Sequence, residues 1–292
     1  MQEIIYIQPG GSRYDPDTSI TITSRKRPET VYIINSPTGL GAVGVNLQTS
    51  DAAGKNGAYL QGATLEPRQV ADTITIRGRT REEMYAARDK LERILSPLAG
   101  EGTLIYRNDA GEWTIPAIAS VYGDAQARIA RNFCRVGVSF YSADPLWRED
   151  MTSDVLLYRY ARGDALPVTF PTQLQDTLRA GVVYNGGSAP AQPDFAIAGP
   201  LTGVSIECVT TGEIINFPAL SLDAGDVATV NGAGLRTTVF RAATGRTEQV
   251  VPEYGFTYPS LPLLRSSWRV GVDWADAGAS VRMRFKKLFV GV

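Results

Sequence analysis

The stretch VGVSFYSADPLWRED, residues 136–150, begins as a regular strand and ends in a turn halfway along the chain. From Cys134 to Phe140 every second residue is apolar, and the residues between them are polar or small, which predicts a half-buried strand. Asp144-Pro145 ends the pattern, because proline has no N–H to offer a neighbouring strand and keeps the residue before it out of a helical conformation. We therefore expect the chain to leave a sheet here, with one domain before the break and one after it.

The size and charge of the chain limit what it can be. It has 292 residues, 43% of them apolar, which suits two domains of roughly 100 to 150 residues each. Lys and Arg number 29 against 30 Asp and Glu, so no overall charge attracts nucleic acid or an anionic membrane. No apolar run approaches the roughly 18 residues that cross a bilayer, and the first residues do not resemble a secretion signal. We expect a protein kept in the cytoplasm at least until cell lysis, without nucleic-acid or membrane partners.

Histidine is absent from the sequence. Its absence excludes Ser-His and Cys-His nucleophile activation, the common zinc sites and imidazole general-base catalysis. A glycosidase-like pair of carboxylates remains open, because the 30 acidic residues offer many pairs and sequence spacing does not determine their distance in a β protein. Cys134 and Cys208 lie on the apolar faces of expected strands and are interpreted as buried free thiols. We predict no catalytic residue, no cofactor and no metal site.

Two glycine motifs suggest a nucleotide site but lack its context. Residues 39–44, GLGAVG, match the G-x-G-x-x-G pattern of dinucleotide-binding folds, which requires a strand before it and a helix after it. Here Pro37 precedes the motif and the strand-like residues 45–49 follow it, so a glycine-rich loop is favoured. Gly54-Lys55 lacks both the first glycine and the final hydroxyl of a phosphate-binding loop.

The first half contains short β patterns separated by turn signals, which predict an antiparallel sandwich or barrel. Residues 80–97 differ and predict one amphipathic helix over about residues 81–95. Thr80 and Glu83 form a capping box, apolar residues recur at helical spacing, and Pro97 ends the run. We interpret it as a helix lying on its own sandwich, with a partner-binding helix as the alternative.

The second half shows β patterns without a helix. Apolar and polar residues alternate over 204–208, 268–274 and 281–286, with glycine-rich turns between the runs, which predicts a second sandwich of jelly-roll size. The last run carries a basic cluster that could suggest nucleic-acid binding. No aromatic residues alternate with these charges, so they are interpreted as a solvated strand face. The cluster consists of Arg282, Arg284, Lys286 and Lys287.

Several short stretches, in this order along nearly the whole chain, resemble the distal tail proteins of long-tailed, non-contractile bacteriophages. They are TGLG (38–41), TITIRGRTREEMYAARDKLERILSPLAGEGTLIY (73–106), SFYSADPLW (139–147), PDFAIAGP (193–200), TTGEIINF (210–217) and the closing MRFKKLFVGV. The specificity lies in their order and in a single helix within an otherwise β first half. The resemblance implies a mainly β fold of two β-sandwich domains. Residues 1–147 would be the ring-forming domain with the helix, and residues 148–292 a peripheral galectin-like domain.

The resemblance also implies a role. It is that of a non-enzymatic structural hub at the virion tail tip, assembled in the host cytoplasm as a hexameric ring. The ring would join the tail-tube protein to the tail-tip hub protein and to a receptor-binding protein or adhesin. Residues 48–62, QTSDAAGKNGAYLQG, are then the segment expected to extend from the first domain onto the neighbouring subunit. Their polar, glycine-rich composition leaves a mobile surface loop open as well.

Two other functions remain possible from the sequence. One is a carbohydrate-binding module that contacts the host surface, and the other is a carboxylate-pair glycosidase. Against the first, the galectin sugar site depends on a histidine that this chain lacks, and Trp268 and Trp274 are expected to point into the core. Residues 148–292 also leave little room for an added sugar-binding module, so we do not expect direct host binding.

Overall fold

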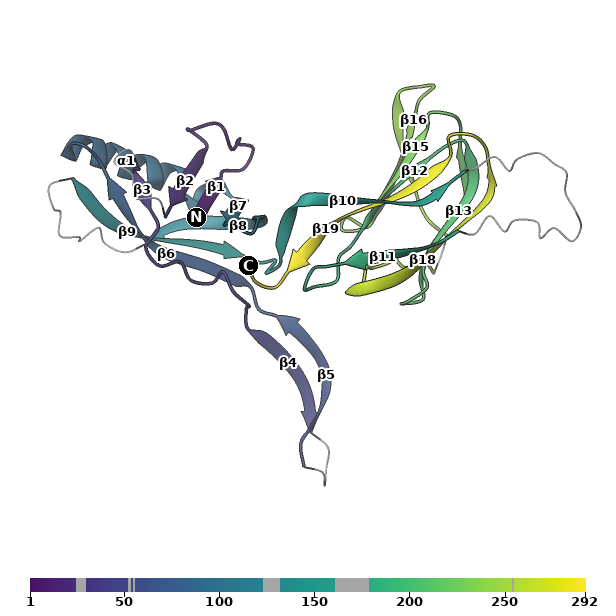
Figure 1. Cartoon of the computed structure of the whole chain (residues 1–292), viewed down its shortest axis with the longest axis horizontal. Helices are drawn as coiled ribbons and strands as arrows, with labels where there is room; N and C mark the ends of the chain where they lie inside the picture. Colours follow the sequence, from purple (N-terminus) through teal and green to yellow (C-terminus); the bar gives the residue numbers. More distant parts are fainter. Residues whose placement is uncertain (25–29, 52–53, 55, 123–131, 161–178, 254) are drawn as a thin grey trace, which may run out of the picture. The chain divides into compact units, whose positions relative to one another are not determined.

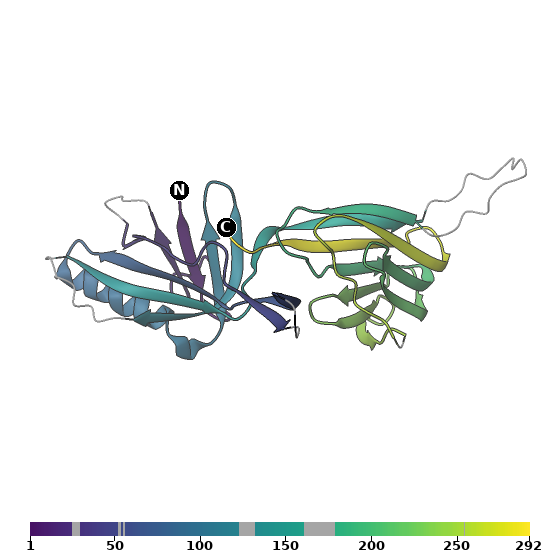
Figure 2. The ribbon, with the colours of Figure 1, turned by 90° about the horizontal axis from the view of Figure 1, so that it is seen from below.

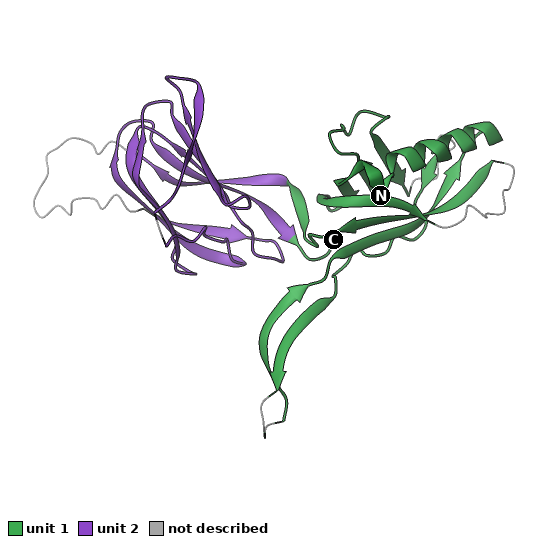
Figure 3. Cartoon of the chain, turned by 180° about the vertical axis from the view of Figure 1, so that it is seen from behind, with its two compact units in different colours: residues 1–150, 289–292 green, residues 151–288 purple. Residues whose placement is uncertain are grey.

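The computed structural model describes residues 1–292 except 25–29, 52–53, 55, 123–131, 161–178 and 254. The described residues form a mainly β protein with one α-helix, as predicted. They make two compact units, Met1–Asp150 with Phe289–Val292 and Met151–Leu288 (Figure 3). Strands β10 (Trp147–Arg159) and β19 (Ser280–Phe289) each continue from one unit into the other, so the chain passes between the units twice. That the two units fold as independent domains stays a prediction.

In the first unit the strands close into a barrel. They are β1 (Glu3–Ile7), β2 (Ser19–Thr23), β3 (Tyr32–Ile33), β6 (Arg68–Arg77), β7 (Gly102–Arg107), β8 (Glu112–Tyr122) and β9 (Phe133–Ser142). They pair in the order β8-β7-β1-β2-β3-β6-β9, and β9 pairs again with β8. The sequence left sandwich and barrel open for this half, and the pairing gives a barrel in place of the sandwich expected for residues 1–147. The reason is the length of β8, which pairs with β7 over its first six residues and with β9 from Ile118 onward.

Helix α1 (Arg81–Ile94) packs along the barrel beside β6 and β9 (Figure 2). Met84, Leu91 and Ile94 are buried, so the helix lies on its own barrel as expected. The Thr80 hydroxyl accepts a hydrogen bond from the Glu83 N–H at 3.2 Å, which is half of the predicted capping box. The Glu83 carboxylate accepts from the N–H of Arg79 at 2.9 Å. The short 3₁₀ helix η1 (Pro97–Ala99) follows. No helix among the described residues is long and apolar enough to cross a membrane.

The second unit is a sandwich of two antiparallel sheets. Besides parts of β10 and β19 it holds β11 (Arg179–Asn185), β12 (Asp194–Ala198), β13 (Leu201–Cys208), β14 (Glu213–Leu222), β15 (Val227–Asn231), β16 (Arg236–Arg241), β17 (Arg246–Val250) and β18 (Leu264–Ala275). One sheet has the order β17-β16-β15-β12-β19-β10, and the other β11-β18-β13-β14. Phe195 and Trp268, one from each sheet, meet in the core with ring centroids 5.8 Å apart. Trp274 is 53% exposed, so its expected burial is wrong; it lies at the end of β18, beyond the last core position, Val272.

The break at Asp144-Pro145 is packed into the first unit. Trp147 is fully buried, and Arg148 pairs with Thr114 of β8 as β10 begins. Arg148 also forms an ion pair with Asp144. The break is therefore a turn between β9 and β10 that remains in the barrel, and the two units separate shortly after it, between Asp150 and Met151. A domain boundary between residues 147 and 148 stays a prediction.

Candidate functional site: a projecting hairpin and its root

The described residues contain no group of Cys, Asp and Glu side chains arranged to hold a metal ion. Cys134 and Cys208 are free and buried, as predicted, and burial raises the pKa of the Cys134 thiol, which makes it a poor nucleophile. Every described carboxyl with a shifted pKa has it lowered; examples are Glu112, Asp154 and Asp226. A glycosidase needs one carboxylic acid with a raised pKa beside a carboxylate, and none of the carboxyls with a shifted pKa is of that kind.

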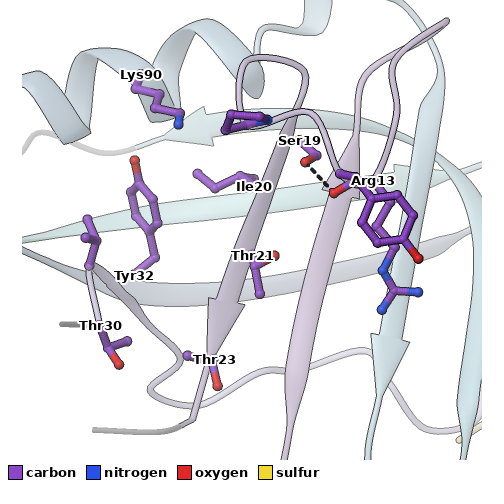
Figure 4. A pocket seen from close by; sticks show the side chains of 11 residues that line it. Arg13, Ser19, Ile20, Thr21, Thr23, Thr30, Tyr32 and Lys90 are labelled. Carbon is purple, nitrogen blue, oxygen red and sulfur yellow. Dashed lines mark hydrogen bonds between the residues drawn. The ribbon is translucent and has the colours of Figure 1, made fainter. Parts of the chain in front are cut away.

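One cavity of the first unit, of about 420 Å³, lies between β2, β3 and helix α1 (Figure 4). Among the described residues its ionisable lining consists of Arg13, Lys90 and two tyrosines, without an acid. The Tyr32 hydroxyl donates a hydrogen bond to the Ala87 carbonyl at 2.9 Å, and burial raises the pKa of Tyr32 to about 12. The Ser19 hydroxyl donates to the Arg13 carbonyl at 3.0 Å. These groups are occupied in holding the barrel together and offer no base or nucleophile.

A two-stranded hairpin projects from the barrel, made of β4 (Val45–Asp51) and β5 (Ala58–Leu65) (Figures 1 and 3). We call it the arm. Among the described residues its strands pair with each other and with no further strand, from Val45 opposite Leu65 to Asp51 opposite Ala58. Most of residues 48–62 thus lie in strands, so the surface-loop interpretation is wrong for them; residues 52, 53 and 55 lie outside the described residues.

A β-bulge gives the arm one apolar face. Strict alternation along β5 would place Leu60 on the face opposite Leu65. The register shifts between Gln48 and Thr49, which brings Leu60 opposite Thr49 and so onto the face of Val45 and Leu47. Val45, Leu47 and Leu60 are 51%, 62% and 65% exposed. The other face carries Asn46, Gln48, Ser50, Tyr59, Gly62 and Thr64.

A second uncharged surface lies on the barrel itself, and we call it the smooth face. It is the outer side of β8, β9 and β6, where exposed Ile118 pairs with exposed Tyr141 and the ring of Tyr122 lies against Gly137. The remaining positions of the smooth face are small or uncharged, and it ends before Thr75, where exposed Arg135 and Arg77 follow on the same side of β9 and β6. The smooth face comprises Gln69, Ala71, Thr73, Ile118, Ser120, Tyr122, Gly137, Ser139 and Tyr141.

The arm leaves the barrel through residues 35–44, which we call the root. The buried carboxylate of Asp72 accepts the N–H groups of Asn35 at 3.2 Å and Ser36 at 2.8 Å. Thr38 then pairs with Ala71 through hydrogen bonds between their backbones. Gly39 follows at φ +80°, where an added Cβ would lie 1.9 Å from the Gln69 carbonyl oxygen. The glycine motif 39–44 thus builds the root, and the cofactor interpretation is not needed.

Arg68 holds the root from inside the barrel. It is 1% exposed, and its Nε donates to the carbonyl of Pro145 at 2.8 Å. One Nη donates to the carbonyls of Gly39 and Gly41, and the other to that of Val290. The guanidinium carbon lies 5.4 Å from the centre of a Trp147 ring, close enough for a cation–π contact. Burial lowers the pKa of Arg68, and its charge is stabilised by carbonyl dipoles.

Sequence reasoning missed Arg68, Asp72 and the bulge. One signal was present, because Arg68 and Asp72 fall in phase with the apolar residues of β6, at the alternate positions that face the core. A charged residue in phase with a core pattern indicates a buried polar contact. The bulge has no comparable signal, since it depends on how β4 and β5 pair.

Comparison with known proteins agrees with this description. Residues 18–133 match the family model of the phage tail protein RIFT-related domain. The fold of the whole chain is similar to that of the Dit protein of phage SPP1, described as a paradigm of hub adsorption apparatus in phages that infect Gram-positive hosts. The two chains are 13% identical, with 99% of each covered and a TM-score of 0.65. A chain of the phage P2 baseplate, in its activated conformation with Ca, is 11% identical over 100% of this chain and 99% of that one, with a TM-score of 0.50. No curated protein matches the sequence.

Proposed function

We propose that this chain, which carries a phage tail domain and whose resemblance to the siphophage distal tail proteins is now confirmed in fold, is a structural hub of a phage tail tip. Six copies form a closed ring in which the arm of each subunit lies on the barrel of the next. The ring joins the tail-tube protein to the tail-tip hub protein and to a receptor-binding protein or adhesin. The observation that carries the proposal is the exposed apolar face of the arm, because an apolar surface on a projecting element is typical of a protein interface.

The smooth face is the surface that fits the arm. Both surfaces are rich in aliphatic or aromatic side chains, and these can meet without burying a charge, because Asp51, the charged residue on the same face of the arm, lies at the other end of β4 from Val45. Both belong to the same unit, yet the arm extends away from its own barrel. A contact between two different patches of identical subunits is head-to-tail, and such contacts either close into a ring or continue as a filament. A tail tip requires the closed form.

The proposed role needs no catalysis. The lack of an acid among the described lining residues of the cavity and the lowered carboxyl pKa values are consistent with a protein that acts through its surfaces. The ring would be built from the first unit, in the host cytoplasm, and would remain at the tail tip of the virion. The second unit would lie at the periphery.

The test is the oligomeric state of the purified chain, alone and with the tail-tube protein, by light scattering and negative-stain imaging. The parent should form rings. A variant with residues 52–56 shortened, a change that lies partly outside the described residues, should keep the parental melting temperature but close rings less well. Monomers at tens of micromolar even with the tube protein present, or rings from the shortened variant at the parental concentration, would contradict the proposal.

Exposed Trp274 favours one second candidate, carbohydrate binding by the second unit, because an indole ring can stack on the apolar face of a sugar. Glycan-array binding that Trp274→Ala abolishes would support it. If the parent chain binds no glycan, carbohydrate binding is ruled out and the structural hub is the function that remains.

A further inference from the structure

We propose that Arg68 and the last four residues of the chain form a latch that sets the direction of the arm and couples it to the two strands leading to the second unit. This inference goes beyond the proposed function and does not depend on ring formation. It rests on the partners of one buried guanidinium and on the packing of residues 289–292.

The first observation is the choice of partners around Arg68. A buried guanidinium without hydrogen bonds is strongly unfavourable, so it is normally paired with an acid. The four acceptors of Arg68 among the described residues are instead main-chain carbonyls, and they belong to three segments far apart in the sequence. Gly39 and Gly41 lie in the root, Pro145 lies two residues before β10, and Val290 lies one residue after β19. The side chain therefore joins the backbones of these segments, which a carboxylate partner would not do.

The second observation is that the end of the chain packs on the same root. The Phe289 ring meets Trp113 edge-on, with ring centroids 6.4 Å apart. An added Cβ on Gly291 would lie 2.7 Å from the carbonyl carbon of Gly41, so the two backbones touch there. The Val292 N–H donates to the Leu40 carbonyl at 3.1 Å. Residues 289–292 thus pack on the same root that Arg68 holds through its hydrogen bonds to Gly39 and Gly41.

The consequence follows from the course of the chain. β10 and β19 are the two strands through which it passes between the units. A force that displaces either strand acts on the carbonyl of Pro145 or of Val290, and both are bound to Arg68. The same guanidinium holds Gly39 and Gly41, so the root must either move with the strand or lose its hydrogen bonds. A displacement that begins in a connecting strand is then transmitted to the arm through one side chain.

The test measures the direction of the arm in the full chain at a concentration where it is monomeric. Nitroxide labels are placed on exposed positions by Gln48→Cys in the arm and Glu82→Cys in α1; the native cysteines are buried and do not compete. Two variants open the latch, Arg68→Met and removal of residues 289–292. Arg77→Met is the matched control, because it removes an exposed arginine from the same strand.

Opening the latch should broaden the distance distribution between the labels, while Arg77→Met keeps the parental width. Amide exchange at Thr38 and Glu66, whose N–H groups donate to the carbonyls of Ala71 and Gly44 at the two ends of the root, should also accelerate about tenfold or more, the effect of losing a hydrogen bond to a charged group. The combined variant should broaden the distribution no further than either change alone, since both act on one contact.

The proposal would be overturned if both latch variants melt cooperatively and keep the parental width of the distance distribution. Equal broadening of the distribution in Arg77→Met would also overturn it. If Arg68→Met does not fold, the width of the distance distribution in the variant without residues 289–292 tests the proposal. If neither variant folds, the same measurement on Gly291→Val tests the proposal, because this substitution changes no charge and only separates residues 289–292 from Gly41.

Discussion

Leu47→Glu should prevent ring formation and leave the barrel as stable as the parent. Leu47 is 62% exposed on the apolar face of the arm, and no barrel strand pairs with β4. Full burial of a leucine contributes roughly 1.5–3 kcal/mol, so covering its exposed part at an interface contributes about 1–2 kcal/mol. The substitution removes this contribution and buries a carboxylate without a partner, which costs about 1–3 kcal/mol more in protein mutational data. The sum of about 2–5 kcal/mol weakens each contact roughly 30-fold to several thousand-fold.

Sedimentation velocity over a range of concentrations measures this effect, with thermal melting of the same samples as the stability check. Gln48→Glu is the matched control, because it adds the same charge one residue away on the opposite face of the arm. We expect Gln48→Glu to form rings as the parent does, and both variants to melt at the parental temperature. Rings of Leu47→Glu at the parental concentration would refute the assignment of the interface to this face. An equal loss of ring formation in Gln48→Glu would show that any added charge on the arm prevents ring formation, whichever face carries it.

Two further predictions concern the stability of the chain. Gly39→Ala should destabilise the first unit by more than about 2 kcal/mol, because the new Cβ overlaps a main-chain oxygen and the residue has a positive φ. Gly41→Ala is the control and should melt as the parent does, because its Cβ meets nothing within 4 Å. Thermal melting of the pair checks this, and equal melting temperatures would contradict it. The free energy of unfolding should be flat between about pH 5.5 and 8, because no histidine titrates there. It should fall below about pH 4.5, because Glu112 keeps a lowered pKa beside Arg13 and Arg107 when folded, so the unfolded state takes up its proton at higher pH. Urea unfolding from pH 3 to 7 measures this fall, and Glu112→Gln should reduce it; an unchanged slope in that variant would contradict the assignment.

The sequence was informative wherever one local signal decides the structure. Thr80, the apolar spacing and Pro97 located the helix to within one residue of its end, because caps and periodicity act over a few residues. The β pattern of the second half predicted a two-sheet sandwich for the same reason. Trp274 was predicted wrongly, since period alone does not tell where along a strand the core ends.

Features that depend on pairing over long distances could not be predicted. Closure of the barrel requires β8 to pair with both β7 and β9, and no residue of β8 signals this double role. The apolar face of the arm depends on a bulge, which moves Leu60 across the strand without changing the sequence pattern. Residues 289–292 return to the first unit to contact Arg68, more than 200 positions earlier, and the glycine run of residues 39–44.

The glycine pattern of residues 39–44 has a structural reason in this chain that it shares only in part with dinucleotide-binding motifs. A glycine is required where another group must approach the backbone closely, and a phosphate is one such group among several. Here Gly39 is approached by the Gln69 carbonyl and Gly44 by the carboxylate of Glu66, whereas a Cβ on Gly41 would meet nothing within 4 Å; the close approach to the Gly41 backbone requires the glycine at position 291. The motif therefore indicates close packing against the backbone, and the elements on either side of it determine which group packs there. Because a barrel strand precedes it and β4 follows it, the approaching groups here belong to the chain itself, and they turn the backbone out of the barrel into the arm.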